Sequence, residues 1–205
     1  MRRAMITHLF FDVGGVLGSS GWGAEARALA VQKFRLDGDD FDRRHREVVG
    51  RWEEGRLSLD EYLECTVFDV PRPYGPVDFK AFMFAQSRPN PETVAVAAAL
   101  AATGRYRLAT INNESAELNA HRLRHFGLAP IFTAFFSSCW LGVAKPARRI
   151  YELALAMSQA EPARAVLIDD REQNLPPARA LGMRAIRYTG AGRLRQDLAA
   201  LGVAV

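Results

Sequence analysis

The sequence predicts an α/β protein, in which a parallel sheet carries helices on both faces and an all-helical block follows the first strand. Two observations predict this class. From about residue 88 onward, short apolar runs alternate with amphipathic segments, the pattern of successive βα units. Near the N-terminus one further apolar run ends at Asp12, and residues 21–86 then show helical periodicity without any strand pattern.

The first half of the chain supplies one strand and four helices. The strand is expected at residues 7–12, bounded by Gly14-Gly15. Helices are expected at residues 25–36, 41–54, 59–68 and 77–86, separated by Asp37-Gly38, by Gly55 and by the proline-rich residues 71–76. Ser58 followed by Glu61 is a capping-box pattern, which marks the start of the third helix.

The second half supplies the rest of the sheet. Strands are expected at residues 106–111, 134–137, 165–169 and 184–187, and helices at residues 93–102, 114–126, 148–157, 172–181 and up to about 201. Residues 1–17 and 88–205 would therefore form the α/β core, and residues 18–87 an inserted helical block. An insertion directly after a strand is well placed to act as a lid over the strand ends.

Composition excludes several classes of function. The net charge of +4 is mild, and the sequence has no basic runs, so we do not expect nucleic acid as a partner. A slight positive charge favours, at most, small anionic ligands. The sequence contains no run of 18 apolar residues, so we expect no membrane span. Cys65 and Cys139 lie far apart and form no CxxC pair, so we expect neither a disulfide nor a zinc site. We therefore also expect a cytoplasmic location, where cysteines stay reduced. Monomer and homodimer both stay open.

Polar residues follow the expected strands at their carboxyl ends, where ligands bind in parallel sheets. They are Asp12, Asn112, Asn113, Lys145, Asp169 and Asp170. A single polar residue after a strand is usually only a turn former or helix cap. Two adjacent buried carboxylates, however, are costly without a cation, and with Asp12 they make an all-oxygen site suited to Mg²⁺. Lys145 is one of only three lysines in an arginine-rich chain, which suggests a site for a compact charge.

Four segments in order carry a resemblance to a known family. The segments "FFDVGGVL", "LATINN", "GVAKP" and "VLIDDREQN" resemble the four signature motifs of the haloacid dehalogenase (HAD) superfamily. "EEGRLSLDEYLE" resembles a helix pair of its small helical cap, and "KPARRIYELAL" its usual Lys-Pro-x-x-x-Ile-Tyr run. The resemblance spans essentially the whole chain and is strongest to the branch of α-glucose-1-phosphate phosphatases. It implies a Rossmann-like parallel-sheet core with an inserted all-helical cap.

The resemblance also implies a reaction: Mg²⁺-dependent hydrolysis of a small phosphorylated metabolite. Asp12 would attack phosphorus and form an aspartyl-phosphate. Mg²⁺ would be held by Asp12, the backbone carbonyl of Gly14 and Asp170, with Asp169 close by. Lys145 would neutralise charge on Asp12 and on the phosphoryl oxygens.

Three amides would complete the site. Asn112 stands where the family usually has Ser or Thr, and its amide would donate to a phosphoryl oxygen, with Asn113 beside it on the substrate. Asn174 matches the acid or amide that usually follows the metal-binding acid four residues later.

Gly14 departs from the pattern of typical family phosphatases, which carry an aspartate there as general acid and base. Its loss removes an effect worth about 10²–10⁴-fold in rate. Three hypotheses accommodate it: a phosphatase for esters with good leaving groups, a metal-independent 2-haloacid dehalogenase, or a catalytically weak protein that binds phosphorylated ligands. The dehalogenase hypothesis leaves the acid pair Asp169-Asp170 unexplained, whereas Asn112 in place of a hydroxyl residue is consistent with the binding hypothesis.

The helical block contributes weaker signals. Trp22 and Trp52 are expected in the core of the block, and the charged run at residues 42–47 is expected to be a solvated helix face.

Overall fold

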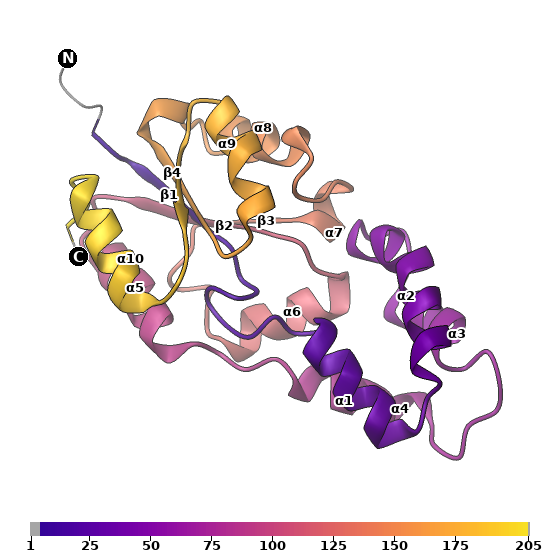
Figure 1. Cartoon of the computed structure of the whole chain (residues 1–205). Coiled ribbons are helices and arrows are strands. Elements are labelled where there is room, and N and C mark those ends of the chain that lie inside the picture. The colour runs from indigo at the N-terminus through magenta and orange to yellow at the C-terminus, as the bar shows by residue number, and fades with distance from the viewer. Residues whose placement is uncertain (1–4, 205) are drawn as a thin grey trace.

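A computed structural model describes residues 5–204. Five strands form one parallel sheet in the order β3-β2-β1-β4-β5 (Figure 1). The strands are β1 (His8–Phe11), β2 (Arg107–Asn112), β3 (Ala134–Ser137), β4 (Ala165–Asp169) and β5 (Arg184–Arg187). All strand ends therefore point the same way, and the predicted α/β class is confirmed.

The central strand β1 explains why the sheet is apolar on both faces. Leu9 pairs in register with Leu108 of β2 and Val166 of β4, and all three are buried. Leu9 and Phe11 pack toward α5 (Pro91–Ala102) and α10 (Ala191–Ala200), while Phe10 between them packs toward the opposite face. Alternate residues of a strand point to opposite faces, so a strand covered on both sides reads as a continuous apolar run.

The second face of the sheet is covered by α8 (Arg148–Met157) and α9 (Leu175–Ala180). A short 3₁₀ turn, Glu172–Asn174, precedes α9, where the sequence predicts one helix over residues 172–181. Pro176 and Pro177 lie in the first turn of α9, where missing backbone N–H groups cost nothing. A four-residue helix, α7 (Ser138–Leu141), follows β3 and was not expected from the sequence.

Helices α1 (Ala24–Phe34), α2 (Gly38–Glu53), α3 (Leu59–Thr66) and α4 (Pro76–Ala85) lie together to one side of the sheet (Figure 1). We call these four helices the helical block. Helix α2 begins three residues before the predicted start, because Asp37 is its N-cap and its side chain accepts from the Asp40 N–H at 3.1 Å. The predicted capping box of Ser58 and Glu61 at α3 is confirmed.

The helical block has its own core, centred on aromatic rings. Trp52 stacks on Tyr62 with ring centroids 3.9 Å apart, and Trp22 donates its indole N–H to the Tyr62 hydroxyl at 2.8 Å. Both tryptophans are buried, as the sequence predicts. Leu118 of α6 (Ala116–His125) joins this core from the α/β side. The block is thereby packed onto the sheet domain at α6.

Two polar contacts fix the end of α2 and the start of α3 against the α/β core. The Ser138 hydroxyl donates to the backbone carbonyl of Glu53 at 2.6 Å, and the Leu59 N–H donates to Glu117 at 2.8 Å. Gly55 adopts φ +71°, and a Cβ there would lie 2.1 Å from the carbonyl oxygen of Cys139. Only glycine allows the chain to approach α7 so closely.

Within residues 5–204, no helix combines the length and the apolar character that a membrane crossing requires.

Candidate active site

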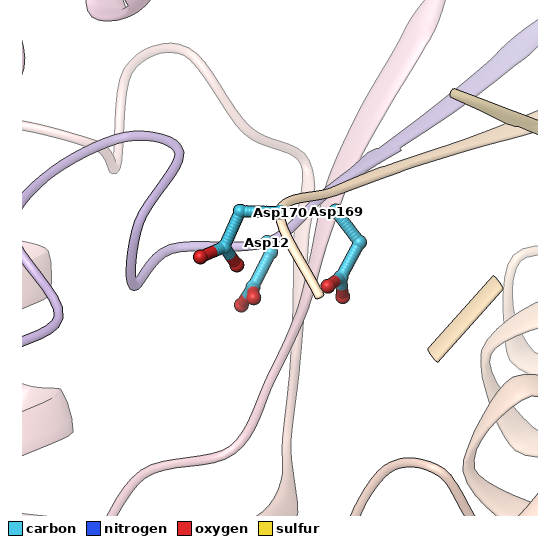
Figure 2. Close-up of side chains that lie close together, drawn as sticks. All are labelled: Asp12, Asp169 and Asp170. Carbon is cyan, nitrogen blue, oxygen red and sulfur yellow. The ribbon is translucent and has the colours of Figure 1, made fainter. Parts of the chain in front are cut away.

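The carboxyl ends of β1 and β4 place three carboxylates side by side. Asp12 directly follows β1, Asp169 ends β4 and Asp170 comes next, and one oxygen of each lies within 4.8 Å of the others (Figure 2). Asp12 is 6% exposed and Asp169 is fully buried. The Asp12 N–H continues the strand ladder by donating to the Ile168 carbonyl at 2.9 Å, which aligns the two strand ends.

Asp169 is saturated with hydrogen-bond donors. Its Oδ1 accepts from the Arg171 N–H at 2.9 Å and from the Asn174 amide at 2.9 Å. Its Oδ2 accepts from Lys145 Nζ at 2.6 Å and from the same amide at 3.1 Å. A carboxylate has about four lone-pair positions, so Asp169 has no lone pair left for a further ligand. Asn174 thus lies against the acid pair, where the resemblance places it.

Asp170 shows the opposite character. Its Oδ1 is buried and has no hydrogen-bond partner among the described residues. Gly15 adopts φ +77° beside it, and a Cβ there would lie 2.2 Å from Asp170 Oδ2, so the loop leaves room for this carboxylate only because residue 15 is glycine. Burial raises the pKa of Asp170, and the charge of Asp169 raises it further. An unpaired buried carboxylate oxygen is a costly arrangement that a cation relieves.

Lys145 lies between two of the acids. Its Nζ is 3.0 Å from Asp12 Oδ2 and 2.6 Å from Asp169 Oδ2, and its side chain is 2% exposed. Burial raises the pKa of Asp12; Lys145 opposes that rise and Asp169 adds to it. Burial alone lowers the pKa of Lys145, but Asp12 and Asp169 outweigh burial and raise it. The ammonium of Lys145 contacts two of the three carboxylates, which leaves the cluster with excess negative charge, and oxygen donors of this kind suit a divalent cation such as Mg²⁺.

Asn113 holds Lys145 by its main chain. Its Oδ1 accepts from the Lys145 N–H at 2.8 Å, and its Nδ2 donates to the Lys145 carbonyl at 2.9 Å. Asn113 also lines the cavity above the strand ends. The residue that the sequence assigns to substrate contact therefore positions Lys145 as well.

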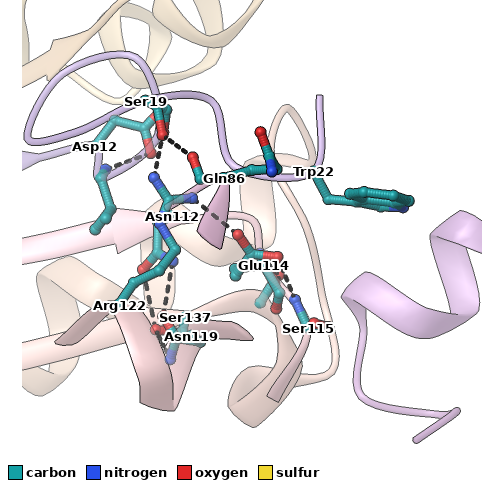
Figure 3. Close-up of polar contacts among 12 residues, drawn as sticks. Asp12, Ser19, Trp22, Gln86, Asn112, Glu114, Ser115, Asn119, Arg122 and Ser137 are labelled. Atoms are coloured by element: carbon teal, nitrogen blue, oxygen red, sulfur yellow. Dashed lines mark hydrogen bonds and ion pairs between the residues drawn. The ribbon is translucent and has the colours of Figure 1, made fainter. Parts of the chain in front are cut away.

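Asn112 is placed differently from the expectation that its amide donates to a phosphoryl oxygen. It is buried, and its Nδ2 donates to Asn119 at 3.0 Å while its Oδ1 accepts from the Ser137 hydroxyl at 2.9 Å. Asn119 in turn donates to Ser137 at 3.0 Å, which closes a triangle beneath the strand ends (Figure 3). Asn112 is not among the residues that line the cavity, and its side chain braces β2, β3 and α6.

An ion pair lies beside Gly14, where family phosphatases carry an acid. Arg122 donates from Nη1 to Glu114 Oε2 at 2.9 Å and from Nη2 to the Ser19 carbonyl (Figure 3). The side chains are 2% and 8% exposed. A Cβ built on Gly14 would have Arg122 Nη1 as its nearest neighbour, 3.6 Å away. Helix α6 begins at Ala116 and not at the predicted residue 114, and Glu114 lies before it with its side chain on Arg122.

A cavity of about 390 Å³ lies between the strand ends and the helical block. From the strand ends it is lined by Asp12, Gly14, Asn113 and Lys145, which the sequence predicts at the site. Further charged or titratable residues line it that the sequence did not single out or assigned elsewhere: Arg27, His45, Glu53, Glu114, Arg122 and Arg171.

His45 is the clearest exception to the prediction of a solvated face at residues 42–47. It is buried at 7% exposure, and its Nδ1 lies 2.9 Å from the Tyr62 hydroxyl. That hydroxyl accepts from the Trp22 indole N–H, and its own hydrogen is available to donate to His45 Nδ1 when that nitrogen carries no proton. Burial lowers the pKa of His45 to about 4, consistent with a neutral ring.

Comparison with known proteins agrees with this geometry. The chain is 27% identical over 193 residues to a glyceraldehyde 3-phosphate phosphatase from Methanothermobacter thermautotrophicus, covering 89% of this chain and 85% of that one. Its fold is similar to that of a HAD-family enzyme from Bacteroides thetaiotaomicron solved with magnesium and inorganic phosphate, with TM-score 0.75 and 18% identity, covering 90% and 94% of the two chains.

The fold is also similar to that of an L-2-haloacid dehalogenase from Xanthobacter autotrophicus, with TM-score 0.63 and 17% identity, covering 98% of this chain and 85% of that one. At these identities the two structures show the fold alone. A family model for haloacid dehalogenase-like hydrolases matches residues 6–182. With the acids, the lysine and the parallel sheet in the expected order, the chain belongs to the haloacid dehalogenase-like hydrolase family.

Proposed function

We propose that this hydrolase is a Mg²⁺-dependent phosphatase that cleaves a small phosphate monoester through an aspartyl-phosphate on Asp12. The observation that carries the proposal is the arrangement of Asp12, Lys145 and Asp170. Asp12 lines the cavity, and its Oδ2 lies 3.0 Å from Lys145 Nζ. Asp170 has a buried Oδ1 without a hydrogen-bond partner among the described residues. A nucleophile, a fixed positive charge and a free oxygen ligand are thus combined at one strand edge.

Asp12, the backbone carbonyl of Gly14 and Asp170 are the groups that would hold Mg²⁺. The unpartnered Oδ1 of Asp170 fits a direct ligand, whereas the saturated Asp169 fits a supporting role through Lys145 and Asn174. Bound Mg²⁺ would offset repulsion between the carboxylates and a phosphate dianion.

The residues of the chain have distinct roles in this proposal. Asp12 Oδ attacks phosphorus, and the bond to the leaving oxygen breaks. Lys145 neutralises charge on Asp12 and on the phosphoryl group, and its position is fixed by Asn113 and Asp169. Water then attacks the phosphorus of the aspartyl-phosphate, which releases phosphate and restores Asp12.

The cavity favours a small polar substrate. Its volume of about 390 Å³ lies toward the lower end of the range for ligand sites, roughly 300–1,000 Å³. Its lining is rich in charged and hydrogen-bonding side chains, which suits a sugar phosphate or a triose phosphate better than a large apolar ester. The similar protein from Methanothermobacter thermautotrophicus is a glyceraldehyde 3-phosphate phosphatase, which makes triose phosphates the first class to test.

The acid pair argues against the dehalogenase alternative. Halide leaves as an anion and requires neither a proton nor a cation, so a dehalogenase would have no use for Asp170 with an unpaired buried oxygen. A protein that only binds phosphorylated ligands would have no use for a carboxylate aimed into the cavity, because Asp12 repels a phosphate dianion.

Phosphate release from a substrate panel tests the proposal. The panel pairs sugar 1-phosphates with their 6-phosphates and adds glyceraldehyde 3-phosphate and a 2-haloacid, each with Mg²⁺ and with a chelator. We expect Mg²⁺-dependent phosphate release that is lost in Asp12→Asn. Halide release without metal would favour the dehalogenase. If wild type and Asp12→Asn both bind a phosphate ester and neither hydrolyses it, the protein only binds phosphorylated ligands.

A further inference from the structure

The helical block brings to the cavity a carboxyl group that has no role in the proposed reaction so far. Glu53 is the last residue of α2, and it lines the same cavity as Asp12 and Lys145. Its neighbour Trp52 points into the core of the block and stacks on Tyr62. The end of α2 thus brings Glu53 to the cavity that Asp12 and Lys145 line from the strand ends.

The position of Glu53 is fixed by its main chain. Its backbone carbonyl accepts from the Ser138 hydroxyl at 2.6 Å, and two residues later Gly55 packs against the Cys139 carbonyl. Both contacts join the end of α2 to α7, which directly follows β3. The end of α2 is thus docked on the α/β core, and Glu53 is held at the cavity and not on a free surface.

The carboxyl group of Glu53 makes no hydrogen bond or ion pair within residues 5–204, in contrast to the other cavity glutamate. Glu114 has both oxygens engaged, because Oε2 accepts from Arg122 at 2.9 Å and Oε1 accepts from the Ser115 N–H at 3.0 Å. Glu114 is therefore held in place by its bonds, whereas Glu53 is free to exchange a proton with a bound molecule.

The surroundings of Glu53 bring its protonation equilibrium to neutral pH. Burial raises the pKa of Glu53 to about 7, and the charge of Glu114 adds to the rise, while Arg171 and Lys145 oppose it. The charge of Asp12 also acts on it, which places the two carboxyl groups within electrostatic reach. The other ionisable groups that line the cavity are Arg27, His45 and Arg122. A general acid or base works best when its pKa is near the working pH.

We propose that Glu53 supplies, from the helical block, the proton donor and acceptor that Gly14 cannot be. The inference rests on the proposed phosphatase function. In phosphoryl transfer the attacking and leaving oxygens lie roughly in line. Attack by Asp12 from the strand ends therefore directs the leaving oxygen away from the sheet, toward the side of the cavity where Glu53 lies.

The proton balance of the two steps is simple. As the bond between phosphorus and the leaving oxygen breaks, the Glu53 carboxyl gives its proton to that oxygen, and an alcohol departs. The Glu53 carboxylate then takes a proton from the water that attacks the aspartyl-phosphate, so that phosphate leaves and Glu53 is protonated again. One side chain performs both transfers, and no further reactant is needed.

A leaving-group comparison tests this role with Glu53→Gln and the control Glu54→Gln. Glu54 is the adjacent carboxylate, but it pairs with Arg56 at 2.8 Å and does not line the cavity. With a sugar 6-phosphate, whose alkoxide needs a proton, Glu53→Gln should lower kcat/KM by about 10²–10⁴-fold. With 4-nitrophenyl phosphate, whose phenolate leaves unprotonated, kcat/KM should stay near wild type and a burst of nitrophenolate should precede a slow steady state. Glu54→Gln should match wild type with both.

The outcomes separate this inference from the function on which it rests. If Glu53→Gln loses kcat/KM equally with both substrates and shows no burst, Glu53 only supports the fold of the cavity. If kcat/KM is unchanged with both, Glu53 takes no part in the reaction. Either result overturns the inference, while phosphate release by wild type still upholds the phosphatase. If neither wild type nor Asp12→Asn releases phosphate from any ester, both the inference and the proposed phosphatase function are contradicted. Thermal unfolding of Glu53→Gln checks folding, and we expect no loss of stability because its carboxyl has no partner within the described chain.

Discussion

Asn113 binds both polar groups of the Lys145 main chain, accepting from its N–H at 2.8 Å and donating to its carbonyl at 2.9 Å. Lys145 Nζ in turn lies between Asp12 and Asp169. The loop after β2 thereby sets the position of a lysine that follows β3, and the charge that acts on the nucleophile depends on an amide 32 residues earlier.

Asn113→Ala removes both of these bonds and leaves two backbone groups of Lys145 unsatisfied. We expect the free energy of unfolding to fall by about 1–3 kcal/mol and kcat to fall with it. Asn113→Asp keeps the acceptor for the Lys145 N–H and should lie between Asn113→Ala and wild type in both measurements. Denaturant unfolding and phosphate release check this, and an unchanged kcat in Asn113→Ala would contradict the positioning role.

The two adjacent acids should differ in their effect on metal binding. Asp170→Asn removes the carboxylate with a free oxygen and should abolish detectable Mg²⁺ binding in a calorimetric titration. Asp169→Asn alters a group that contacts Lys145 and Asn174, so Mg²⁺ affinity should fall by about 10–100-fold, the usual cost of a supporting residue. Stronger impairment in Asp169→Asn than in Asp170→Asn would reverse the assignment.

The ion pair of Arg122 and Glu114 should be important for stability. The pair is almost fully buried, and Arg122 also binds the Ser19 carbonyl in the loop after β1. Arg122→Met leaves a buried carboxylate without its partner, which costs about 3–5 kcal/mol. The double variant with Glu114→Gln should lose less than the sum of the two single losses. A double-mutant cycle by urea unfolding measures this coupling, and additive losses would show that the pair contributes nothing as a pair.

His45 should make stability depend on pH below neutrality. Its folded pKa is lowered to about 4, against a usual value near 6.5, with burial as the main cause and Arg27 next. Between these values the unfolded chain takes up a proton that the folded chain does not. The stabilisation is therefore complete above pH 6.5 and is lost as the pH falls toward 4, by up to about 1.4 kcal/mol per pH unit.

Comparison with His45→Asn isolates this effect from other groups that titrate in the same range. The asparagine oxygen can accept from the Tyr62 hydroxyl but does not gain a proton at these pH values. The difference in unfolding free energy between wild type and variant should shrink from pH 7 to pH 5. If the two proteins lose stability in parallel, His45 does not carry the pH dependence.

The strand ends could be predicted from the sequence because each depends only on the residues of its own strand. A buried parallel strand reads as an apolar run, and the polar residue that ends it must lie at the common edge of the sheet. This rule predicts Asp12, Asp169 and Asp170, whereas Lys145 is predicted from its place in the loop after the third strand, and the structure brings the four together. Asn112 was expected beside them by its place in the chain, but the direction of its side chain depends on Asn119 and Ser137.

The contributions of the helical block could not be predicted, because they depend on docking between units. His45 and Glu53 belong to a helix with many charged residues, and helical periodicity says only which side faces the core of the block. Whether the other side meets solvent or a second domain is set by contacts such as that of Ser138 with the Glu53 carbonyl. Gly14 signalled a missing acid, but nothing local indicates that a carboxyl from α2 lies across the cavity.

The central claim is that Asp12 carries the phosphoryl group, and trapping the covalent intermediate tests it most directly. Wild-type protein turning over a phosphate ester with Mg²⁺ would be quenched in acid, digested and mapped by mass spectrometry, with Asp12→Asn alongside. The account predicts phosphate on the peptide that contains Asp12, removable by hydroxylamine and absent from the variant. Phosphate release without any phosphorylated peptide, or phosphate on another residue, would contradict it.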